Sequence, residues 1–276
     1  MRIAVTGGMG KLGQWVVREL AAAGHELTVF DRVPGPEKQA IRYLAGEITD
    51  LGQVFGALSG AEAVVHLAAV HRYGITSDDV TFRTNVLGTF NVHEAAFRLG
   101  IPRVVSTSSE SVLGWDYRTR DFLPDYLPID EDHPVRPQDA YGLSKQAGES
   151  ISRSYTEKCG MATIVLRPPW VASPEEMDEL GRSGGRRPTR FVLYNYVDAR
   201  DLAEAYRLAV ERPLVGHTVL FTTANDSSVA EPLCELFPRL LPELGSMAQE
   251  LTGTRPSVRN DRARRVLGWQ PKRGWR

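Results

Sequence analysis

Apolar residues along this chain alternate between short continuous runs and stripes at helical spacing. Arg2–Thr6 is a short apolar run that ends in glycines, which is typical of a buried strand. Lys11–Ala23 then has its apolar residues on one helical face, and Gly24 can end that helix. The same reading predicts further strands over 27–30, 63–69, 103–107, 161–166 and 218–222, and further helices over 51–58 (with Asp50 as N-cap), 85–99, 141–158 and 201–211.

Regular alternation of strands and helices predicts an α/β fold with a Rossmann-like, doubly wound parallel sheet covered by helices on both faces. Two segments interrupt the alternation: a loop over 115–138 with prolines and aromatic residues, and a polar stretch over 172–190. A loop as long as the first is usually functional or disordered. We therefore predict a main domain over 1–171, to which 191–224 returns, and a small interleaved C-terminal region made of 172–190 and 225–276.

The composition is that of an ordinary soluble globular protein. The chain has 276 residues, 42% of them hydrophobic, and a formal net charge of −1. This balance argues against attraction to nucleic acid or to an anionic membrane. The first residues already form a strand, and the sequence has no apolar run of membrane-spanning length, so we expect a cytoplasmic protein. Cys159 and Cys234 fit no metal-ligand spacing and are expected to be free thiols, with no metal site.

Three glycines follow the first predicted strand. Gly7, Gly10 and Gly13 form a G-x-x-G-x-x-G turn between that strand and the next helix, with Lys11 and Leu12 between the last two. The first glycine permits the tight turn, the second lets a pyrophosphate approach the backbone, and the third allows close packing of helix on strand. A glycine triplet is a weak signal by itself, but its position here predicts a dinucleotide site and makes 1–171 the cofactor-binding domain.

Asp31 lies at the end of the second apolar run, 31 − 13 = 18 residues after the last glycine. A carboxylate there can accept hydrogen bonds from both ribose hydroxyls and repels a 2′-phosphate, which favours NAD over NADP. Arg32 is adjacent and suits such a phosphate, so NADP is the less favoured alternative. Asp31 as a simple turn residue is a further alternative.

Tyr141 and Lys145 form a Tyr-x-x-x-Lys pair whose i,i+4 spacing puts both side chains on one face of a helix. A free tyrosine has a pKa near 10, and a neighbouring ammonium group with an oxidised nicotinamide ring favours the phenolate. Ser106–Ser109 ends an apolar strand, at the sheet edge where doubly wound folds bind ligands. The order of glycine turn, acidic residue, serines and Tyr-x-x-x-Lys predicts a site for acid–base chemistry on a hydroxyl or carbonyl.

These motifs resemble those of the extended short-chain dehydrogenase/reductase superfamily, in its NAD-dependent epimerase/dehydratase group. The resemblance covers nearly the whole chain. Thr6–Gly13 is similar to the nucleotide turn of that group, 46–50 to its adenine-flanking segment, 66–69 to the strand end beneath the cofactor, and 85–91 to its N-x-x-G-T-x-N helix start. Ser108–Gly114 resembles its S-S-x-x-V-Y-G segment, which makes Ser109 the hydroxyl residue. Later landmarks are 166–168, 196–198 with Asp201, and 267–269; Asp201 is expected to N-cap its helix.

The resemblance implies a role for each of these positions. Tyr141 would exchange a proton with the substrate hydroxyl, Lys145 would hold the ribose, and Ser109 would bind the reacting oxygen. The substrate would contact Ser108, Ser109, Glu110 and Trp170. The cofactor would contact Gly7, Gly10, Lys11, Leu12, Gly13, Asp31, Arg32, Glu47, Ile48, Leu67, Ala68, Ala69, Asn85, Tyr141, Lys145 and Pro168.

The resemblance also narrows the reaction to hydride transfer between a small sugar-like or hydroxylated substrate and NAD. Dehydratases of the group have an Asp-Glu pair where this chain has Glu110-Ser111, and nucleotide-sugar enzymes have an Asn that is missing after Arg167-Pro-Pro. The chain has some resemblance to uronate dehydrogenases, which show Ser-Ser-Asn-His where this chain has Ser-Ser-Glu-Ser. The arginines at 182, 186, 187 and 190 suit a carboxylate or phosphate, or form a solvated loop.

Several alternatives stay open at this point. A sugar or nucleotide-sugar epimerase is the second enzymatic hypothesis, and an NAD-sensing regulatory protein is the non-enzymatic one. Trp115, Tyr117, Phe122 and Tyr126 either wall the substrate pocket or anchor the long loop. The resemblance also implies a homodimer through helices 85–99 and 141–158. Phe90, Phe97 and Tyr155 are suited to contacts there or to the protein core.

Overall fold

The computed structural model describes residues 1–36, 41–186 and 192–276. Within these ranges a sheet of seven parallel strands runs in the order β3-β2-β1-β4-β5-β6-β9. Strands β2 and β3 lie on one side of β1 and β4, β5, β6 and β9 on the other, which confirms the doubly wound topology. The strands are β1 (Arg2–Thr6), β2 (Glu26–Asp31), β3 (Arg42–Ala45), β4 (Ala63–His66), β5 (Arg103–Thr107), β6 (Ala162–Arg167) and β9 (His217–Phe221).

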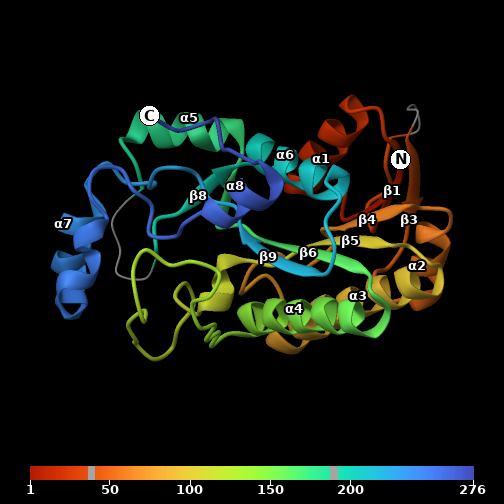
Figure 1. Ribbon diagram of the computed structural model, residues 1–276, viewed down its shortest axis with the longest axis horizontal. Coiled ribbons are helices and arrows are strands. Elements are labelled where there is room, and N and C mark those ends of the chain that lie inside the picture. The colour runs from red at the N-terminus through yellow and green to blue at the C-terminus, as the bar shows by residue number, and fades with distance from the viewer. Residues whose placement is uncertain (37–40, 187–191) are drawn as a thin grey trace.

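Helices cover both faces of this sheet (Figure 1). On one face lie α1 (Lys11–Ala22), α6 (Ala199–Glu211) and α8 (Asp261–Leu267), and on the other α2 (Leu51–Leu58), α3 (Asp78–Arg98) and α4 (Ala140–Cys159). Each set buries its own apolar cluster against the strands. The predicted α/β architecture is therefore confirmed, and no helix in the described ranges has both the length and the apolarity needed to cross a bilayer.

Some element boundaries differ from the prediction. The helix predicted over 85–99 begins at Asp78, since Ser77 precedes it and Asp78 and Asp79 lie in its first turn, where acidic side chains are favoured by the helix dipole. The strand predicted over 63–69 ends at His66, and the backbone at Leu67 and Ala68 lies directly against Gly7. Strand β3 was not predicted, because it is a short, half-exposed edge strand without a clear apolar pattern.

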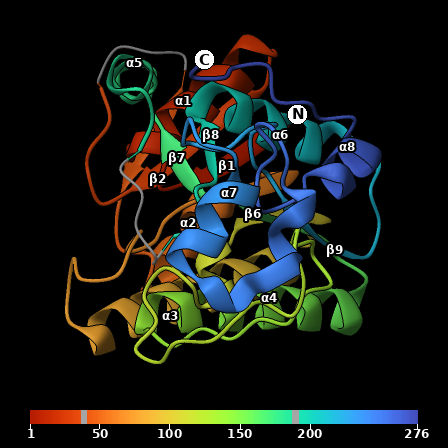
Figure 2. The same ribbon diagram turned by 90° about the vertical axis from the view of Figure 1, so that its left-hand side faces the viewer.

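A second, smaller layer is built at one end of the sheet. It contains a two-stranded parallel sheet of β7 (Trp170–Ala172) and β8 (Tyr196–Asp198), and the helices α5 (Pro174–Ser183), α7 (Leu233–Leu240) and η2 (Pro242–Glu250). Figure 2 looks from this end and shows α7 in front of the central strands. Trp115 and Leu127 of the long 115–138 loop are buried in the same cluster as Phe237 of α7. The loop is thus packed onto the small layer.

The division into domains stays a prediction, and the packing adds detail to it. The predicted small region includes 225–276, yet Ala263, Leu267 and Trp269 are buried in the cluster beneath α1 and α6. The segment 263–269 therefore packs against the main sheet layer, whereas Trp275 near the chain end packs against Ala172 and Tyr196 of the small layer.

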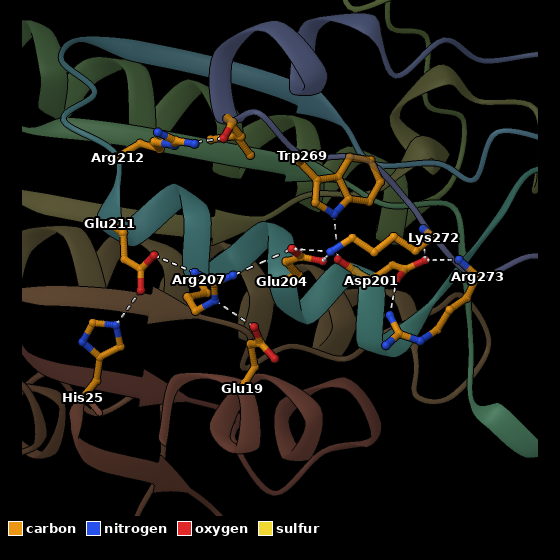
Figure 3. Close-up of polar contacts among 11 residues, drawn as sticks. Glu19, His25, Asp201, Glu204, Arg207, Glu211, Arg212, Trp269, Lys272 and Arg273 are labelled. Carbon is orange, nitrogen blue, oxygen red and sulfur yellow. Dashed lines mark hydrogen bonds and ion pairs between the residues drawn. The ribbon is translucent and has the colours of Figure 1, made fainter. Parts of the chain in front are cut away.

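Asp201 holds the chain end in place (Figure 3). The expected N-cap role for Asp201 is wrong, because Asp198 caps α6 by accepting from the backbone N–H of Arg200. Asp201 is fully buried, and its Oδ2 accepts from the backbone N–H groups of Lys272 and Arg273 at 2.8 Å each. Its backbone carbonyl accepts from the indole of Trp269 at 2.7 Å.

Candidate active site

The glycine turn lies where β1 meets β4, at the point where the strand order reverses. Gly7 has φ +74°, and a Cβ built there would stand 2.5 Å from the backbone nitrogen of Ala68. The carbonyl of Gly7 lies where a side chain on Gly13 would have to go. Only glycine fits either position, so the backbone of the turn can lie directly against the end of β4.

The N-terminus of α1 faces outward from this turn and has the features of an anion site. Gly10 is its N-cap and offers no side-chain cap, and the first turn contains no acidic residue. The first N–H groups of a helix, here those of Lys11, Leu12 and Gly13, have no partners within the helix. The Lys11 side chain itself pairs with Glu176 and donates to the carbonyl of Val171 at 2.9 Å. Lys11 therefore joins the turn to α5.

Asp31 ends β2 beside the same turn. Its Oδ2 accepts from the N–H of Met9 at 3.0 Å and its Oδ1 from the N–H of Val33 at 3.2 Å. The carboxylate thus has a structural role in fixing the glycine turn and still lies at the edge of the site. Arg32 and Glu47 are both exposed, and Ile48 is buried against Gly88 of α3.

Asn85 joins three elements beneath the site. Its Oδ1 accepts from the N–H of Val70 at 2.8 Å, and its Nδ2 donates to the Val70 carbonyl at 3.1 Å and to the Ser144 hydroxyl at 2.9 Å. The segment after β4, which contains Leu67, Ala68 and Ala69, is therefore tied to α3 and α4. These hydrogen bonds of Asn85 fix the segment beneath the glycine turn relative to the start of α4.

Tyr141 and Ser109 meet at the carboxyl end of β5. Tyr141 lies in the first turn of α4, which Asp139 caps by accepting from the N–H of Gly142 at 2.9 Å. Both side chains are nearly buried. Burial raises the pKa of Tyr141 above its usual value of 10.0, and the nearby Ser109 hydroxyl lowers it in part. The lowered pKa expected from the sequence is not found for the polypeptide by itself, because desolvation outweighs it.

Lys145 lies one helical turn after Tyr141, and its Nζ is 5.6 Å from the centroid of the phenol ring. The ammonium group donates to the carbonyl of Thr107 at 2.9 Å. Burial lowers the pKa of Lys145 to about 8, against the opposing charge of Glu149. The predicted set of Ser109, Tyr141 and Lys145 is therefore brought together at one point.

A buried network behind Lys145 was not identified from the sequence. Glu149 accepts from Arg167 Nε and Nη2 at 2.7 Å each and from the Ser108 hydroxyl at 2.6 Å. Ser108 thus faces Glu149, away from Ser109. A weak sequence signal existed, since Glu149 follows Lys145 by one helical turn and Arg167 lies in a segment already recognised as a landmark.

A second polar cluster faces Ser109 from the side of the small layer. Glu110 is buried and accepts from Asn195 Nδ2 at 2.9 Å, and its N–H donates to the carbonyl of Pro168 at 3.0 Å. Burial and the nearby Asp116 carboxylate raise the pKa of Glu110 well above its usual range. The guanidinium of Arg186 lies 4.7 Å from the ring centroid of Trp170 and exerts its charge on both carboxyl groups.

The arginines of 182–190 and the aromatic residues of the 115–138 loop lie at different places in the structure. Arg186 lies at the polar cluster, Arg182 is exposed on α5, and the residues at 187 and 190 lie outside the described ranges. Trp115 packs with Phe122 inside the small layer, which supports an anchoring role. The ring centroids of Tyr117 and Tyr73 are 5.4 Å apart, and Tyr117 lies near Asp116 at the rim of the site. Tyr126 is exposed and donates to Asp130.

Comparison with known proteins gives a family match. Residues 3–219 match the model of the "NAD dependent epimerase/dehydratase family". That range includes the glycine turn and every residue of the Ser109, Tyr141 and Lys145 set.

Among curated relatives are sugar dehydrogenases and sugar-nucleotide epimerases. L-arabinose 1-dehydrogenase (NAD(P)(+)) of Haloferax volcanii is 29% identical, over 82% of this chain and 89% of that protein. UDP-glucose 4-epimerase of Rhizobium meliloti is 26% identical, over 98% and 92%. Uronate dehydrogenase of Pseudomonas syringae pv. tomato is 28% identical, over 83% and 76%. These relatives are enzymes, in line with the enzymatic reading of the sequence.

Solved structures show the same fold. A short-chain dehydrogenase/reductase superfamily protein from Agrobacterium tumefaciens, with bound NAD, superimposes with a TM-score of 0.77 at 25% identity, over 100% of this chain and 94% of that one.

Proposed function

Since this chain belongs to the NAD dependent epimerase/dehydratase family, we propose that it is an NAD-dependent dehydrogenase that oxidises a hydroxyl carbon of a small sugar-like substrate. The observation that carries the proposal is the meeting of Ser109, Tyr141 and Lys145 at the carboxyl end of β5. A sugar epimerase is the alternative, since it uses the same set and such enzymes are among the relatives.

The residues around the glycine turn fit a dinucleotide. The pyrophosphate would lie on the uncapped first turn of α1, at Gly10 to Gly13, and 67–69 would lie beneath the cofactor. Asp31 would accept from the adenosine ribose, which favours NAD over NADP, while Arg32 is exposed beside it. Glu47 and Ile48 would flank the adenine, and Pro168 would lie near the nicotinamide. NAD supplies the hydride acceptor of the reaction.

The chain's own residues would handle the proton and the substrate oxygen. Ser109 would donate a hydrogen bond to the reacting oxygen and hold it beside Tyr141. Tyr141 would remove the hydroxyl proton as phenolate. Lys145, fixed by the Thr107 carbonyl, would hold the ribose and stabilise the phenolate by its charge.

The remaining polar groups support a small, polar substrate. Glu110 and Trp170 would line its side of the site, and Arg186 stacked on Trp170 suits a hydroxyl-rich or acidic compound. Ser108 would support the site from behind, since its hydroxyl donates to Glu149. The small layer that includes 172–186 would supply the substrate side, in agreement with the predicted interleaved region.

The test is purified protein with NAD and a panel of aldoses, uronic acids and secondary alcohols, read as NADH absorbance. Stoichiometric NADH with one compound class supports the dehydrogenase. Tyr141→Phe should abolish that signal and keep NAD affinity in calorimetry, because only the proton exchange is lost. Absence of NADH with NAD retained through purification favours the epimerase, and absence of NAD binding refutes the cofactor assignment.

We also propose a homodimer formed through α3 and α4. Large apolar side chains are exposed on these helices, namely Phe82, Leu87, Phe90 and Phe97 on α3 and Leu143 on α4, while Tyr155 is buried. Sedimentation of the protein and of Phe90→Glu measures this: a dimer that the variant splits supports the proposal, and a monomeric wild type refutes it.

A cytoplasmic location is proposed as well, supported by the unpaired Cys159 and Cys234.

A further inference from the structure

Tyr194 has a backbone conformation that large side chains rarely adopt. Its φ is +59°, in the left-handed region where the Cβ of an L-residue crowds the following carbonyl oxygen. The residue is buried, and its ring packs against Phe237 with 6.1 Å between the centroids. Strained backbone of this kind persists only where the surrounding structure over-determines it, and it is concentrated at functional sites. The turn at Tyr194 therefore points to a function for the residue that follows it.

Two serines of the segment 225–276 hold this turn. The carbonyl of Tyr194 accepts from the backbone N–H and from the hydroxyl of Ser228, at 2.8 and 3.1 Å. The carbonyl of Leu193 accepts from the hydroxyl of Ser257 at 2.7 Å. Both serines are fully buried, so water does not compete for these bonds. The turn is thus fixed by its surroundings, and it sets the direction in which Asn195 leaves it.

Asn195 connects this turn with Glu110, the residue that follows Ser109. Its Nδ2 donates to Glu110 Oε2 at 2.9 Å, and its Oδ1 accepts from the Ser257 hydroxyl at 3.2 Å. The side chain therefore has a bond at each end, which fixes the plane of the amide. Asn195 is only 1% exposed, so it acts on the site through Glu110 and not by touching the substrate.

Glu110 is held from two sides and keeps one oxygen free. It begins the short helix η1 (Glu110–Leu113), and its backbone N–H donates to the carbonyl of Pro168 at 3.0 Å. Pro168 leads into β7 and Asn195 leads into β8, and these two strands pair with each other, so both contacts come from one ribbon. Glu110 Oε1 has no hydrogen bond within the described residues and is not fully enclosed.

We propose that Asn195 is a positioning residue, which fixes Glu110 so that its Oε1 hydrogen-bonds a second hydroxyl of the substrate. The inference rests on the proposed function, in which Ser109 binds the reacting oxygen. A hydroxyl both donates and accepts, so it fits the Glu110 carboxyl in either protonation state. Because Ser109 and Glu110 are adjacent in the chain, the two substrate oxygens belong to neighbouring parts of one molecule. The substrate class is therefore a polyhydroxylated compound and not a simple secondary alcohol.

Steady-state kinetics of Asn195→Leu, with whichever compound yields NADH, measure this positioning. Leucine is close to asparagine in size and removes both hydrogen bonds. KM should rise at least about tenfold and kcat should change less than about threefold, because the bond to the second hydroxyl is made in the ground state and the transition state alike. NAD affinity should be unchanged. Asn260→Leu, which removes a buried amide bonded to Thr223 and Asn225 instead, should keep the KM of the wild type.

A double-variant cycle tests whether Asn195 acts through Glu110. Glu110→Leu should raise KM at least as much as Asn195→Leu, and the double variant should be no worse than Glu110→Leu alone. The monodeoxy analogue that lacks the recognised hydroxyl should lose affinity for the wild type but not for Glu110→Leu. An unchanged KM in Asn195→Leu, or effects that multiply in the double variant, would overturn the proposal.

Two further readouts do not depend on turnover. In the Tyr141→Phe background with NAD present, calorimetry should show the substrate bound about tenfold more weakly when Asn195→Leu is added. A crystal structure of Asn195→Leu should show the Glu110 carboxyl moved from its place; an unmoved carboxyl, or an equal fall of NAD affinity and kcat, would overturn the positioning role. Failure of the proposed function is distinct, since it appears as absence of NADH in the wild type.

Discussion

Replacing Glu149 by Gln should destabilise the protein and weaken the site at once. The carboxylate holds Arg167 by two hydrogen bonds of 2.7 Å, and the two side chains are only 10% and 6% exposed. Arg167 Nη1 has no hydrogen-bond partner in the part of the chain that the structure describes. Within the described residues, Nη1 of Arg167 therefore has no acceptor that could compensate when Glu149 loses its charge.

The magnitude follows from the burial of this pair. Removing one partner of a buried ion pair costs about 3–5 kcal/mol, because the other charge is left desolvated and uncompensated. For a chain of this size each kcal/mol corresponds to roughly 2–4 °C, so the melting temperature should fall by roughly 10 °C. The pKa of Lys145 should also fall below about 8, because Glu149 is the charge that raises it, and NAD affinity at neutral pH should weaken.

Thermal and urea unfolding of Glu149→Gln, Arg167→Met and the double variant Glu149→Leu/Arg167→Met measure the effect. The double variant should recover much of the loss, because neither charge is then buried alone. A loss below about 1 kcal/mol in Glu149→Gln, or a double variant as unstable as the sum of the single ones, would refute the reasoning.

Three other perturbations have defined outcomes. Gly7→Ala should abolish NAD binding in calorimetry, because the new Cβ meets the Ala68 backbone. The control Gly24→Ala, with a similar φ of +81° and no neighbour within 4 Å, should bind NAD and lose only about 1–2 kcal/mol of folding stability. Equal NAD affinity in both variants would contradict this. His93 is fully buried and its pKa is lowered by burial from 6.5 to about 4, so below pH 6.5 the unfolded state binds the proton that the folded state refuses. Stability should fall from pH 6.5 toward pH 4, by about 2 kcal/mol at pH 5 from this residue, and an equal fall in His93→Gln would exclude it as the source. Asp201→Ala should cost about 2–4 kcal/mol and speed hydrogen exchange over 269–276, unlike the exposed Asp261→Ala; unchanged exchange there would show that Asp201 does not hold the chain end.

The sequence by itself determined the features that depend on neighbours along the chain. The alternation of apolar runs and helical stripes predicted the parallel sheet, because strand and helix periodicities are local properties. The glycine turn and the Tyr141–Lys145 spacing were equally local, since a tight turn and one helical turn each need only a few residues. The boundary of β3 was missed because this edge strand has no clear apolar pattern, and the start of α3 was missed because the acidic residues after Ser77 were not read as a first helical turn.

Only the tertiary structure decided which polar groups share a proton or a charge. Glu149 meets Arg167, Glu110 meets Asn195, and Asp201 meets Lys272 across long stretches of sequence, because the strand order and the packing of the small layer bring these elements together. Burial is likewise a property of the folded molecule, and it raises the pKa of Tyr141 in the polypeptide by itself, whereas the sequence predicts a lowered pKa with the oxidised cofactor bound. Desolvation acts through all surrounding atoms at once, so no spacing along the chain reveals it.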